Sequence, residues 1–520
     1  MSKVIYEIRK NTYYDSVTLM LISKEVEKIE GVHEALVGMG TDLNKELAEK
    51  LNILTDEIKE IGPNDFFITL LVDENVQIED IVKEVDRMLT EKRKNSDSDY
   101  MPPTLNSALE NQPESNMVLI SVAGEYAADE ARKALEKGLH VMIFSDNVSI
   151  EDEKELKQLA VEKGLLMMGP DCGTAIINNV PLAFANAINK GNIGIVGASG
   201  TGTQEVTVVI DKLGGGISQA IGTGGRDLHE EVGGLMMLQG IEALKDDPNT
   251  EVIVLISKPP AAKIAEKILK AVEGIKKPVV VNFIGGDKET IEKYGVYAAT
   301  SLEDTARKAV ALSKGMDVKD FEGFDLSDEE IEKIVKEEIE KMDKDQKYFR
   351  GLFTGGTLAE EAIQIVSKAV GPINSNIASN PELKLKDVNK SEKHTCIDFG
   401  EDEFTVGKPH PMIDPSTRAE RIVQEAADGE VAVILMDFVL GYGGHEDPVG
   451  ETLPKIMEAK EKAEKAGKHL CIISSICGTE RDPQDIVESQ KRLEEAGVIV
   501  MPTNAQAARL AGLILKEITN

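Results

Sequence analysis

Apolar and polar residues follow two different periods along the first 90 or so residues of the chain. Short apolar runs at "KVIYEIRK", "HEALVGMGT" and "DFFITLLVD" alternate with stretches of helical spacing, such as "SVTLMLISKEVEKIEG" and "IEDIVKEVDRML". This pattern predicts a small α/β unit over residues 1–92, and a ferredoxin-like fold would satisfy it. The next stretch, "TEKRKNSDSDYMPPTLNSALENQPESN", is polar and aperiodic, so it predicts a linker and an irregular entry to the next domain.

From Met117 the pattern changes to continuous apolar runs. "MVLISVAG", "HVMIFSD" and "LLMMGPD" are separated by helical stretches such as "EYAADEARKALEKG". Apolar runs that alternate with helices are typical of a parallel, doubly wound sheet. We therefore predict a Rossmann-like domain over residues 93–190.

Two later segments repeat one plan. In the first, "GIVGASGTGTQEV" is followed by "VIVLISKPPAAKIAEKI", "KPVVVNFIGG" and "GVYAATSLEDTARKAVALS"; in the second, "GLFTGGTLAEEAI" is followed by "VAVILMDFVLGYGGHEDP", "KHLCIISSICG" and "GVIVMPTNAQAARLAGLI". This repeat predicts two flavodoxin-like domains, over residues 191–316 and 347–520. Between them, residues 317–346 are acidic and have the spacing of one amphipathic helix, which predicts a helical linker.

The charge balance narrows the possible functions. Lys and Arg total 59 against 92 Asp and Glu, and a formal net charge of -33 opposes binding to nucleic acid and to anionic membrane surfaces. No apolar run is long enough for a membrane helix, and "MSKVIYEIRKNTYYD" is charged where a signal peptide needs an apolar core. We expect a cytoplasmic protein without nucleic-acid or membrane partners. The 4 cysteines show no CxxC spacing, so neither a disulfide framework nor a metal site is expected.

The first glycine-rich turn is a candidate phosphate site. In "NIGIVGASGTGTQEV" an apolar strand is followed by Ser199, Gly200 and Thr201 and then by a helical stretch, and a helix N-terminus at the carboxyl end of a strand offers unpaired amides. The turn is not a P-loop, because no Lys follows the second glycine. Taken alone, a tight turn capped by Ser or Thr explains it better.

The second copy carries a different glycine cluster, "LGYGGHEDP". Gly441, Gly443 and Gly444 free the backbone directly after a strand, and His445 is placed to donate to an anion or to act as an acid or base. The alternative is a surface turn whose histidine caps a helix.

Two cations and one thiol also follow strands. Arg226 in "IGTGGRDLHEEVGG" is able to bind a carboxylate or phosphate ligand, or to pair with Asp227 or Glu230. Lys258 in "LISKPPAAK" has the same ambiguity between an anionic ligand and an ordinary ion pair. Cys172 in "GPDCGT" has no flanking base, so we interpret it as a packed thiol.

Together these segments resemble the succinyl-CoA synthetase superfamily, and specifically its FdrA branch, from about residue 117 onward. "GLLMMGPDCGTA" followed by "GNIGIVGASGTGTQEV" is similar to the α subunit, from its CoA-binding domain into its first ligase domain, and the chain from Gly351 on resembles the β-subunit ligase domain. The resemblance implies that residues 93–190 are a CoA-binding-type domain and that both flavodoxin-like domains are of ligase type. In the synthetases two helix N-termini point at a shared phosphate. By position these would be Ser199, Gly200 and Thr201 in one copy and Gly443, Gly444 and His445 in the other.

Three differences from the synthetases change what the resemblance implies. The phosphorylated histidine of the synthetases has no counterpart, because no histidine occurs between His229 and His394, and the glutamate that contacts it there aligns with Lys258. The glycine-rich first turn of the CoA domain has no counterpart in "PTLNSALENQPESNMVLISV". Nothing in the chain resembles an ATP-grasp domain. No cofactor is therefore required, and CoA binding stays open.

The FdrA resemblance implies a subunit of a multi-subunit carbamoyltransferase that interconverts oxamate and carbamoyl phosphate with oxalurate and phosphate in allantoin and purine catabolism. The helix termini would hold phosphate, while Arg226, Lys258 and His445 would orient the second anion and stabilise charge at the carbamoyl carbon. The partners would be other subunits and the small anions carbamoyl phosphate, oxamate and phosphate. One alternative is an acyl-CoA synthetase subunit that works with a separate nucleotide-binding subunit. Another is a non-catalytic scaffold or sensing subunit, with the N-terminal unit as a docking module.

Overall fold

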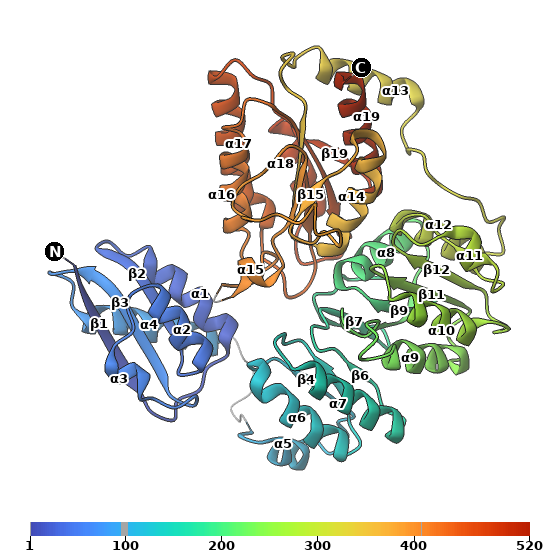
Figure 1. Ribbon diagram of the computed structural model, residues 1–520. Coiled ribbons are helices and arrows are strands. Elements are labelled where there is room, and N and C mark those ends of the chain that lie inside the picture. The colour runs from blue at the N-terminus through green and yellow to red at the C-terminus, as the bar shows by residue number, and fades with distance from the viewer. Residues whose placement is uncertain (1, 95–101, 407, 520) are drawn as a thin grey trace. The chain divides into compact units, whose positions relative to one another are not determined.

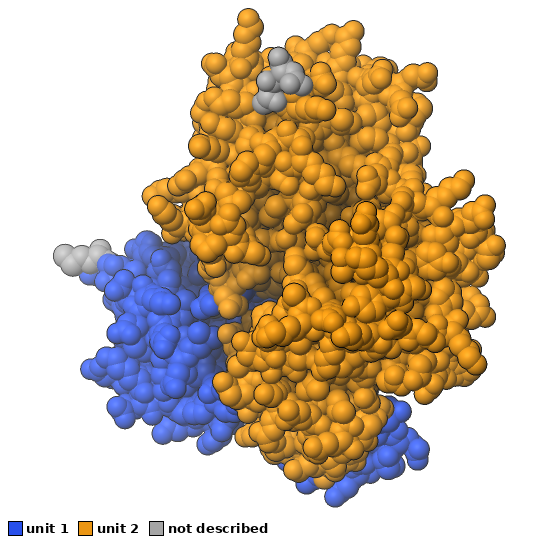
Figure 2. All heavy atoms as spheres, turned by 45° about the vertical axis from the view of Figure 1, so that its right-hand side comes forward, with its two compact units in different colours: residues 1–116, 121–126, 405–409 blue, residues 117–120, 127–404, 410–520 orange. Residues whose placement is uncertain are grey.

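A computed structural model describes residues 2–94, 102–406 and 408–519. The described chain divides into two compact units, which Figure 2 shows in different colours. The first unit comprises residues 1–116, 121–126 and 405–409, and the second comprises residues 117–120, 127–404 and 410–520. We describe each unit by itself.

The first unit contains a three-stranded antiparallel sheet in the order β1-β3-β2, with helices on both faces. The central strand β3 alternates its apolar side chains between two cores, with Phe66 and Ile68 in one and Phe67 in the other. The order of strands and long helices is the βαββα part of a ferredoxin-like fold. Its elements are β1 (Ser2–Arg9), α1 (Ser16–Glu27), β2 (Val32–Met39), α2 (Asp42–Lys50), α3 (Asp56–Lys59), β3 (Phe66–Asp73) and α4 (Ile78–Lys94).

The predicted irregular entry after this sheet contains a helix, α5 (Leu105–Asn111), so that part of the prediction is wrong. Thr104 and Ser107 form a capping box in which each side chain accepts a hydrogen bond from the backbone of the other. This reciprocal cap satisfies amides that the helix leaves unpaired, and it stabilises a helix too short to show a period. Residues 95–101 of the predicted linker lie outside the described residues.

The second unit begins with a small parallel sheet in the order β4-β5-β6, which confirms the predicted strand type. Its elements are β4 (Met117–Ile120), α6 (Gly124–Glu136), β5 (His140–Ile143), α7 (Ile150–Lys163) and β6 (Met167–Met168). The hairpin of β7 (Thr174–Ile177) and β8 (Val180–Ala183) follows and joins the next sheet antiparallel, a feature the sequence analysis missed. Its turn is made by Asn178 and Asn179, which adopt φ of 49° and 66°.

The two repeated segments form two flavodoxin-like domains, as predicted (Figure 1). Counted within each copy, the parallel strands follow the order 2-1-3-4-5, as β10-β9-β11-β12-β13 and as β15/β16-β14-β17-β18-β19. The first domain consists of β9 (Lys190–Ala198), α8 (Gly200–Lys212), β10 (Ile217–Gly222), α9 (Leu235–Asp246), β11 (Val252–Ser257), α10 (Ala262–Val272), β12 (Val279–Phe283), α11 (Lys288–Glu292), β13 (Tyr297–Ala298) and α12 (Leu302–Ser313). The acidic segment that follows contains α13 (Asp328–Ile339).

The second flavodoxin-like domain has the same succession with a longer connection between its first and second helices. It consists of β14 (Tyr348–Phe353), α14 (Gly356–Val370), β15 (Asn374–Ser375), β16 (Thr395–Asp398), α15 (Asp402–Thr405), α16 (Ser416–Glu425), β17 (Val431–Val439), α17 (Pro448–Lys465), β18 (Cys471–Cys477), α18 (Ile486–Glu495), β19 (Ile499–Met501) and α19 (Asn504–Thr519).

The two flavodoxin-like domains share one hydrophobic core, built from α8 and α12 of the first domain and α14 and α19 of the second (Figure 1). Two buried glutamates cross this interface in a repeated way. Glu205 on α8 accepts a hydrogen bond from the backbone N–H of Asn504 at 3.0 Å, and Glu361 on α14 accepts one from Leu302 at 2.7 Å. Each carboxylate therefore caps the last helix of the opposite domain, which brings the first helices, α8 and α14, side by side.

Among the described residues, no helix combines the length and the apolar character needed to cross a membrane.

Candidate anion-binding site

The N-termini of α8 and α14 touch each other. Ser199 Oγ and Thr357 Oγ1 lie 2.5 Å apart and share a hydrogen bond, although 158 residues separate them in the sequence. The side chain of Thr201 lies against Gly355, where a Cβ would come within 2.9 Å of it. Glycine at position 355 thus allows the two helix ends to approach this closely.

Both helix ends carry unpaired backbone amides. In the part of the chain that the structure describes, the N–H groups of Gly200, Thr201, Gly356 and Thr357 have no hydrogen-bond partner. Each end also carries the partial positive charge of a helix N-terminus. Two such ends in contact form a place for an anion with several oxygens, such as a phosphate group.

Lys258 brings a full positive charge to this place from the end of β11. Its Nζ lies 3.1 Å from the position that a Cβ would occupy on Gly356. The same atom is 3.8 Å from Oε1 of Glu401, and the Lys258 side chain is 42% exposed, so this ion pair is loose and solvated. An anion at the helix ends would find Lys258 within reach.

A buried carboxyl group, Asp398, lies on the other side of Gly356, at the end of β16. Its Oδ1 accepts a hydrogen bond from the backbone N–H of Gly400 at 2.8 Å, while Oδ2 lies against the Cα of Gly356. The residue is 3% exposed. Burial raises the pKa of Asp398 to about 7, against the opposing effect of the Lys258 charge and with the help of Glu401.

His410 completes the same corner. Its Nε2 and the Oδ1 atom of Asp398 both lie within 3.1 Å of the position that a Cβ would take on Gly400. Its Nδ1 accepts a hydrogen bond from the backbone N–H of Met412 at 3.2 Å, so the neutral ring carries its proton on Nε2. Burial lowers the pKa of His410 to about 4, so the ring is a neutral donor near pH 7 and not a cation.

The loop before α14 is held by the buried ion pair of Asp437 and Arg418. The two oxygens of Asp437 accept hydrogen bonds from the backbone N–H groups of Thr354 and Gly355, both at 2.8 Å. Asp437 is in turn paired with Arg418 at 3.0 Å, and both side chains are buried. The pair sets the direction in which the free amides of α14 point.

The structure places the second predicted glycine cluster in a different contact. Gly441 and Gly443 have φ of 116° and 75°, which favour glycine, and they pack against the backbone of Ala185 and Ala183. His445 Nδ1 accepts a hydrogen bond from the backbone N–H of Asp447.

Gly444 does not lie at a helix N-terminus. The helix that follows this cluster, α17, begins at Pro448 and is capped by Asp447. The helix N-terminus that meets Ser199 belongs instead to α14, whose residues Gly355, Gly356 and Thr357 the sequence analysis did not single out.

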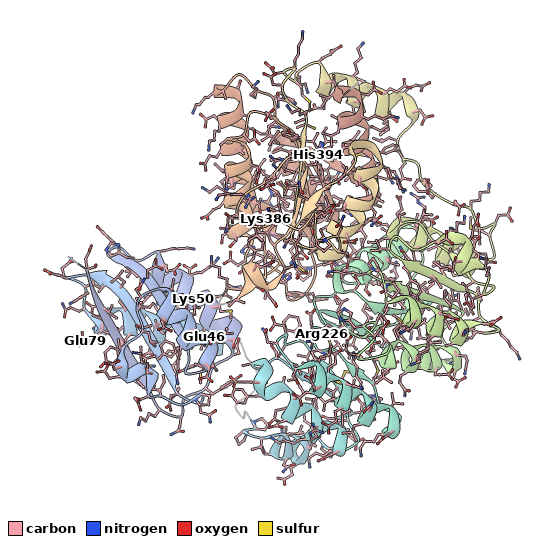
Figure 3. The ribbon with its side chains drawn as sticks, viewed as in Figure 1. Glu46, Lys50, Glu79, Arg226, Lys386 and His394 are labelled. Carbon is pink, nitrogen blue, oxygen red and sulfur yellow. The ribbon has the colours of Figure 1, made fainter. Side chains whose placement is uncertain are left out.

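Arg226, which Figure 3 labels, belongs to an ion cluster between α7 and the first flavodoxin-like domain. It pairs with Glu153 at 2.9 Å and donates a hydrogen bond to the carbonyl of Val148 at 2.8 Å. These contacts differ from the pairing with Asp227 or Glu230 that was considered from the sequence. Asp227 instead pairs with the buried Lys157, which also contacts Glu153. Of the three predicted catalytic side chains, Lys258 lies at the joined helix ends, whereas Arg226 is engaged by Glu153 and the His445 ring by the backbone of Asp447.

The thiols are buried. All 4 cysteines are free and inaccessible, and burial raises the pKa of Cys172 to about 12, as a packed thiol requires. Among the described residues, no group of three or more His, Cys, Asp or Glu side chains is arranged to hold a metal ion.

Asp398 and His410 are the residues that sequence reasoning missed. The run "TCIDFGED" is only a short strand signal, and it was not assigned to the repeat. The available signal was an aspartate at the end of a short buried strand, with a glycine two residues later. Seven histidines are spread along the chain, and nothing in the sequence marks His410 among them.

Three protein-family models match the chain. A CoA-ligase model matches residues 352–514, and a CoA-binding-domain model matches residues 188–285, the segment that contains β9, α8 and Lys258. A model described as the AllF heavy metal-associated domain matches residues 1–103.

Several succinate-type ligases are similar over part of the chain. The α subunit of succinate–CoA ligase (ADP-forming) from Methanothermobacter thermautotrophicus is 29% identical over 174 residues, which are 33% of this chain and 57% of that one. A sulfoacetate–CoA ligase subunit, SqwL, from Acholeplasma sp is 28% identical over 178 residues, which are 32% of this chain and 58% of that one. These matches show that the chain has CoA-binding-type and CoA-ligase-type domains. Both of these relatives are named as subunits of ligases.

Solved structures give more distant similarities. The apo form of dinucleotide forming acetyl-coenzyme A synthetase 1 from Ca. Korarchaeum cryptofilum has a TM-score of 0.32 at 14% identity, over 77% of this chain and 83% of that one. An ATP citrate lyase from Methanothrix soehngenii has a TM-score of 0.35 at 13% identity, over 79% of this chain and 84% of that one.

The protein YahF of Escherichia coli is 48% identical over 504 residues, which are 97% of each chain. The chain therefore belongs to the family of YahF.

Proposed function

We propose that this protein is a subunit of an acid–thiol ligase of the acyl-CoA synthetase class, and that the joined N-termini of α8 and α14 bind the phosphate group of an acyl phosphate. The observation that carries the proposal is the contact of two helix ends with free amides, next to Lys258. The matches to CoA-ligase and CoA-binding families support this reaction class.

Each group at the site would have a separate task. The amides of Gly200, Thr201 and Gly356 would hold the phosphate oxygens, and Lys258 would offset their charge. CoA would enter as the acyl acceptor, next to the segment that the CoA-binding model matches. A separate nucleotide-binding subunit would make the acyl phosphate, and the relatives named as subunits of ADP-forming ligases support a multi-subunit enzyme that uses a nucleotide.

Carbamoyl transfer is a second candidate, and one observation favours it. The segment between β12 and β13, residues 284–296, carries no histidine that would relay a phosphoryl group from a nucleotide. A site with bound phosphate and no relay suits direct transfer from carbamoyl phosphate to a second anion such as oxamate. The match of residues 1–103 to a family named for AllF is compatible with either candidate.

A phosphorolysis assay tests both candidates in the full-length chain, alone and with co-purified partners. The chain is incubated with phosphate and either acetyl-CoA, succinyl-CoA or oxalurate, and hydroxylamine traps any acyl phosphate as a hydroxamate, while carbamoyl phosphate is measured directly. We expect phosphate-dependent hydroxamate from a CoA thioester. Carbamoyl phosphate from oxalurate, without any reaction of the thioesters, would replace the ligase by the carbamoyltransferase.

Two lysine variants serve as a matched pair in this assay. Lys258→Ala should reduce turnover on the order of tenfold or more, because it removes a cation from the phosphate site. Lys263→Ala removes the same charge from an exposed position on α10, where the side chain is 79% exposed, and should leave turnover unchanged. Equal turnover in the two variants, or no phosphate-dependent product from any substrate, would contradict the proposal.

A further inference from the structure

We propose that Asp398 binds the phosphate group as a protonated hydrogen-bond donor and gives its proton to the phosphate when the acyl bond breaks. The inference rests on the proposed anion site and adds a catalytic residue to it. It holds for a thiol acceptor and for an amide acceptor alike, because both lose a proton during the transfer.

The position of Asp398 is the first argument. Its Oδ2 lies against Gly356, whose backbone N–H is free, and Nζ of Lys258 lies near the same point. An anion bound by the Gly356 amide would therefore meet this oxygen. Its Oδ1 is already engaged by the Gly400 N–H, so Oδ2 is the oxygen left for a ligand.

Charge is the second argument. An ionised carboxylate in contact with a phosphate dianion would repel it strongly in a buried site, whereas a carboxylic acid there donates a hydrogen bond. The other groups that face Asp398 decide which form is present: Lys258 favours the ion, Glu401 and Asp437 oppose it, and His410 is a neutral ring. Burial dominates, so the pKa of about 7 leaves the acid readily available near neutral pH.

In the proposed reaction Asp398 both gives a proton and regains one. The acceptor attacks the acyl carbon, the bond from that carbon to the bridging oxygen breaks, and the proton of Asp398 moves to that oxygen. The proton released by the acceptor returns to the carboxylate. The sum is an acyl phosphate plus a protonated acceptor giving the acylated acceptor plus hydrogen phosphate, with no other reactant.

Calorimetry with sulfate tests the binding step in the full-length protein. Sulfate is a tetrahedral dianion that carries no proton in this range, so any proton taken up belongs to the protein. In buffers of different ionisation enthalpy, we expect the wild type to take up close to one proton per sulfate at about pH 8, and its affinity to fall about tenfold per pH unit above about pH 7. Sulfate binding without proton uptake would overturn the proposal for Asp398.

Two variants give the matched comparison. Asp398→Asn keeps an oxygen for the Gly400 N–H, and it should bind sulfate with no proton uptake and no pH dependence. Glu430→Gln changes a carboxylate just before β17 whose side chain is 48% exposed and pairs with Lys347, and it should take up the proton as the wild type does. If Asp398→Asn still took up a proton on binding sulfate, the assignment of that proton to Asp398 would be wrong. A wild type that binds no sulfate at all would instead refute the anion site, and with it the proposed function.

The transfer step is measured with the same variant. In the phosphorolysis assay, Asp398→Asn should lower kcat at least tenfold and lose the pH dependence near pH 7, while its phosphate affinity at pH 6 stays within about threefold of the wild type. A kcat profile equal to that of the wild type would remove the proton-transfer role.

Discussion

Small residues decide how close the two helix ends come. Gly355 leaves room for the side chain of Thr201, and the hydroxyls of Ser199 and Thr357 bond across the contact. Larger side chains at these positions would separate the helices and disperse their free amides. The site is therefore built largely by backbone groups, and the side chains of Thr201, Lys258, Asp398 and His410 add chemistry to it.

The hydroxyl of Thr201 gives the prediction at this scale. Thr201→Val keeps the shape that packs on Gly355 and removes one hydroxyl, so phosphate affinity should fall about ten- to a hundredfold, as expected for a lost hydrogen bond to a charged group. Calorimetry with phosphate measures the loss, and the melting temperature should change little. Thr12→Val, at a half-buried position in the first unit, is the control that should bind phosphate like the wild type. Unchanged affinity in Thr201→Val would reduce this hydroxyl to a helix cap.

Single residues also show how far sequence reasoning reaches. Ser199, Gly200, Thr201 and Lys258 follow strands of the first copy directly, and such positions are recognisable because ligands collect at the carboxyl ends of parallel strands. Asp398 ends the short strand β16 and His410 lies in the irregular segment after it, where no period links either residue to the site. Their roles depend on burial and on neighbours far away in the chain, which a sequence pattern does not contain.

At the scale of elements, the loop from β14 to α14 depends on one buried carboxylate. Asp437 on β17 accepts the N–H groups of Thr354 and Gly355 and pairs with Arg418 on α16. Asp437→Asn places an amide where an acceptor is needed and leaves the Arg418 charge unpaired, so we expect a loss of about 3 to 5 kcal/mol in the free energy of unfolding. Denaturant unfolding measures it.

Glu430→Gln is the control for this prediction. Glu430 precedes the same strand, its side chain is 48% exposed, and it pairs with Lys347 at the surface. Its removal should change the free energy of unfolding by no more than about 0.5 kcal/mol. Similar stability losses in the two variants would show that the buried pair has no special role in holding the loop.

Most elements could be predicted from the hydrophobic pattern, because long parallel strands and amphipathic helices have strong periods. The exceptions are short elements held by specific contacts: α5 by the Thr104 and Ser107 box, and the β7–β8 hairpin by Asn178 and Asn179. The same holds for β16, whose 4 residues carry Asp398. Local side-chain chemistry, and not period, decides these elements.

At the scale of the whole second unit, the internal repeat explains why a site exists between the two copies. The repeat could be read from the sequence, but its consequence could not, since the sequence does not say which faces of the copies pack together. Glu205 and Glu361 fix that choice by capping α19 and α12 of the opposite domains. The pairing brings the N-terminus of α14 to that of α8, while the turn before α17 contacts α8 farther along, where the Gln204 side chain donates to the carbonyl of Leu440.

The central claim is that α8 and α14 bind one oxyanion between them, and the position of a bound anion tests it most directly. Arsenate mimics phosphate and scatters X-rays anomalously, so a crystal of the full-length protein grown with arsenate locates the ion without ambiguity. We predict one strong anomalous peak within hydrogen-bond distance of the amides of Gly200, Thr201 and Gly356 and of Nζ of Lys258, and none at this place in Lys258→Ala at the same concentration. A peak on the turn of Gly443 and Gly444, with nothing at the joined helix ends, would contradict the account.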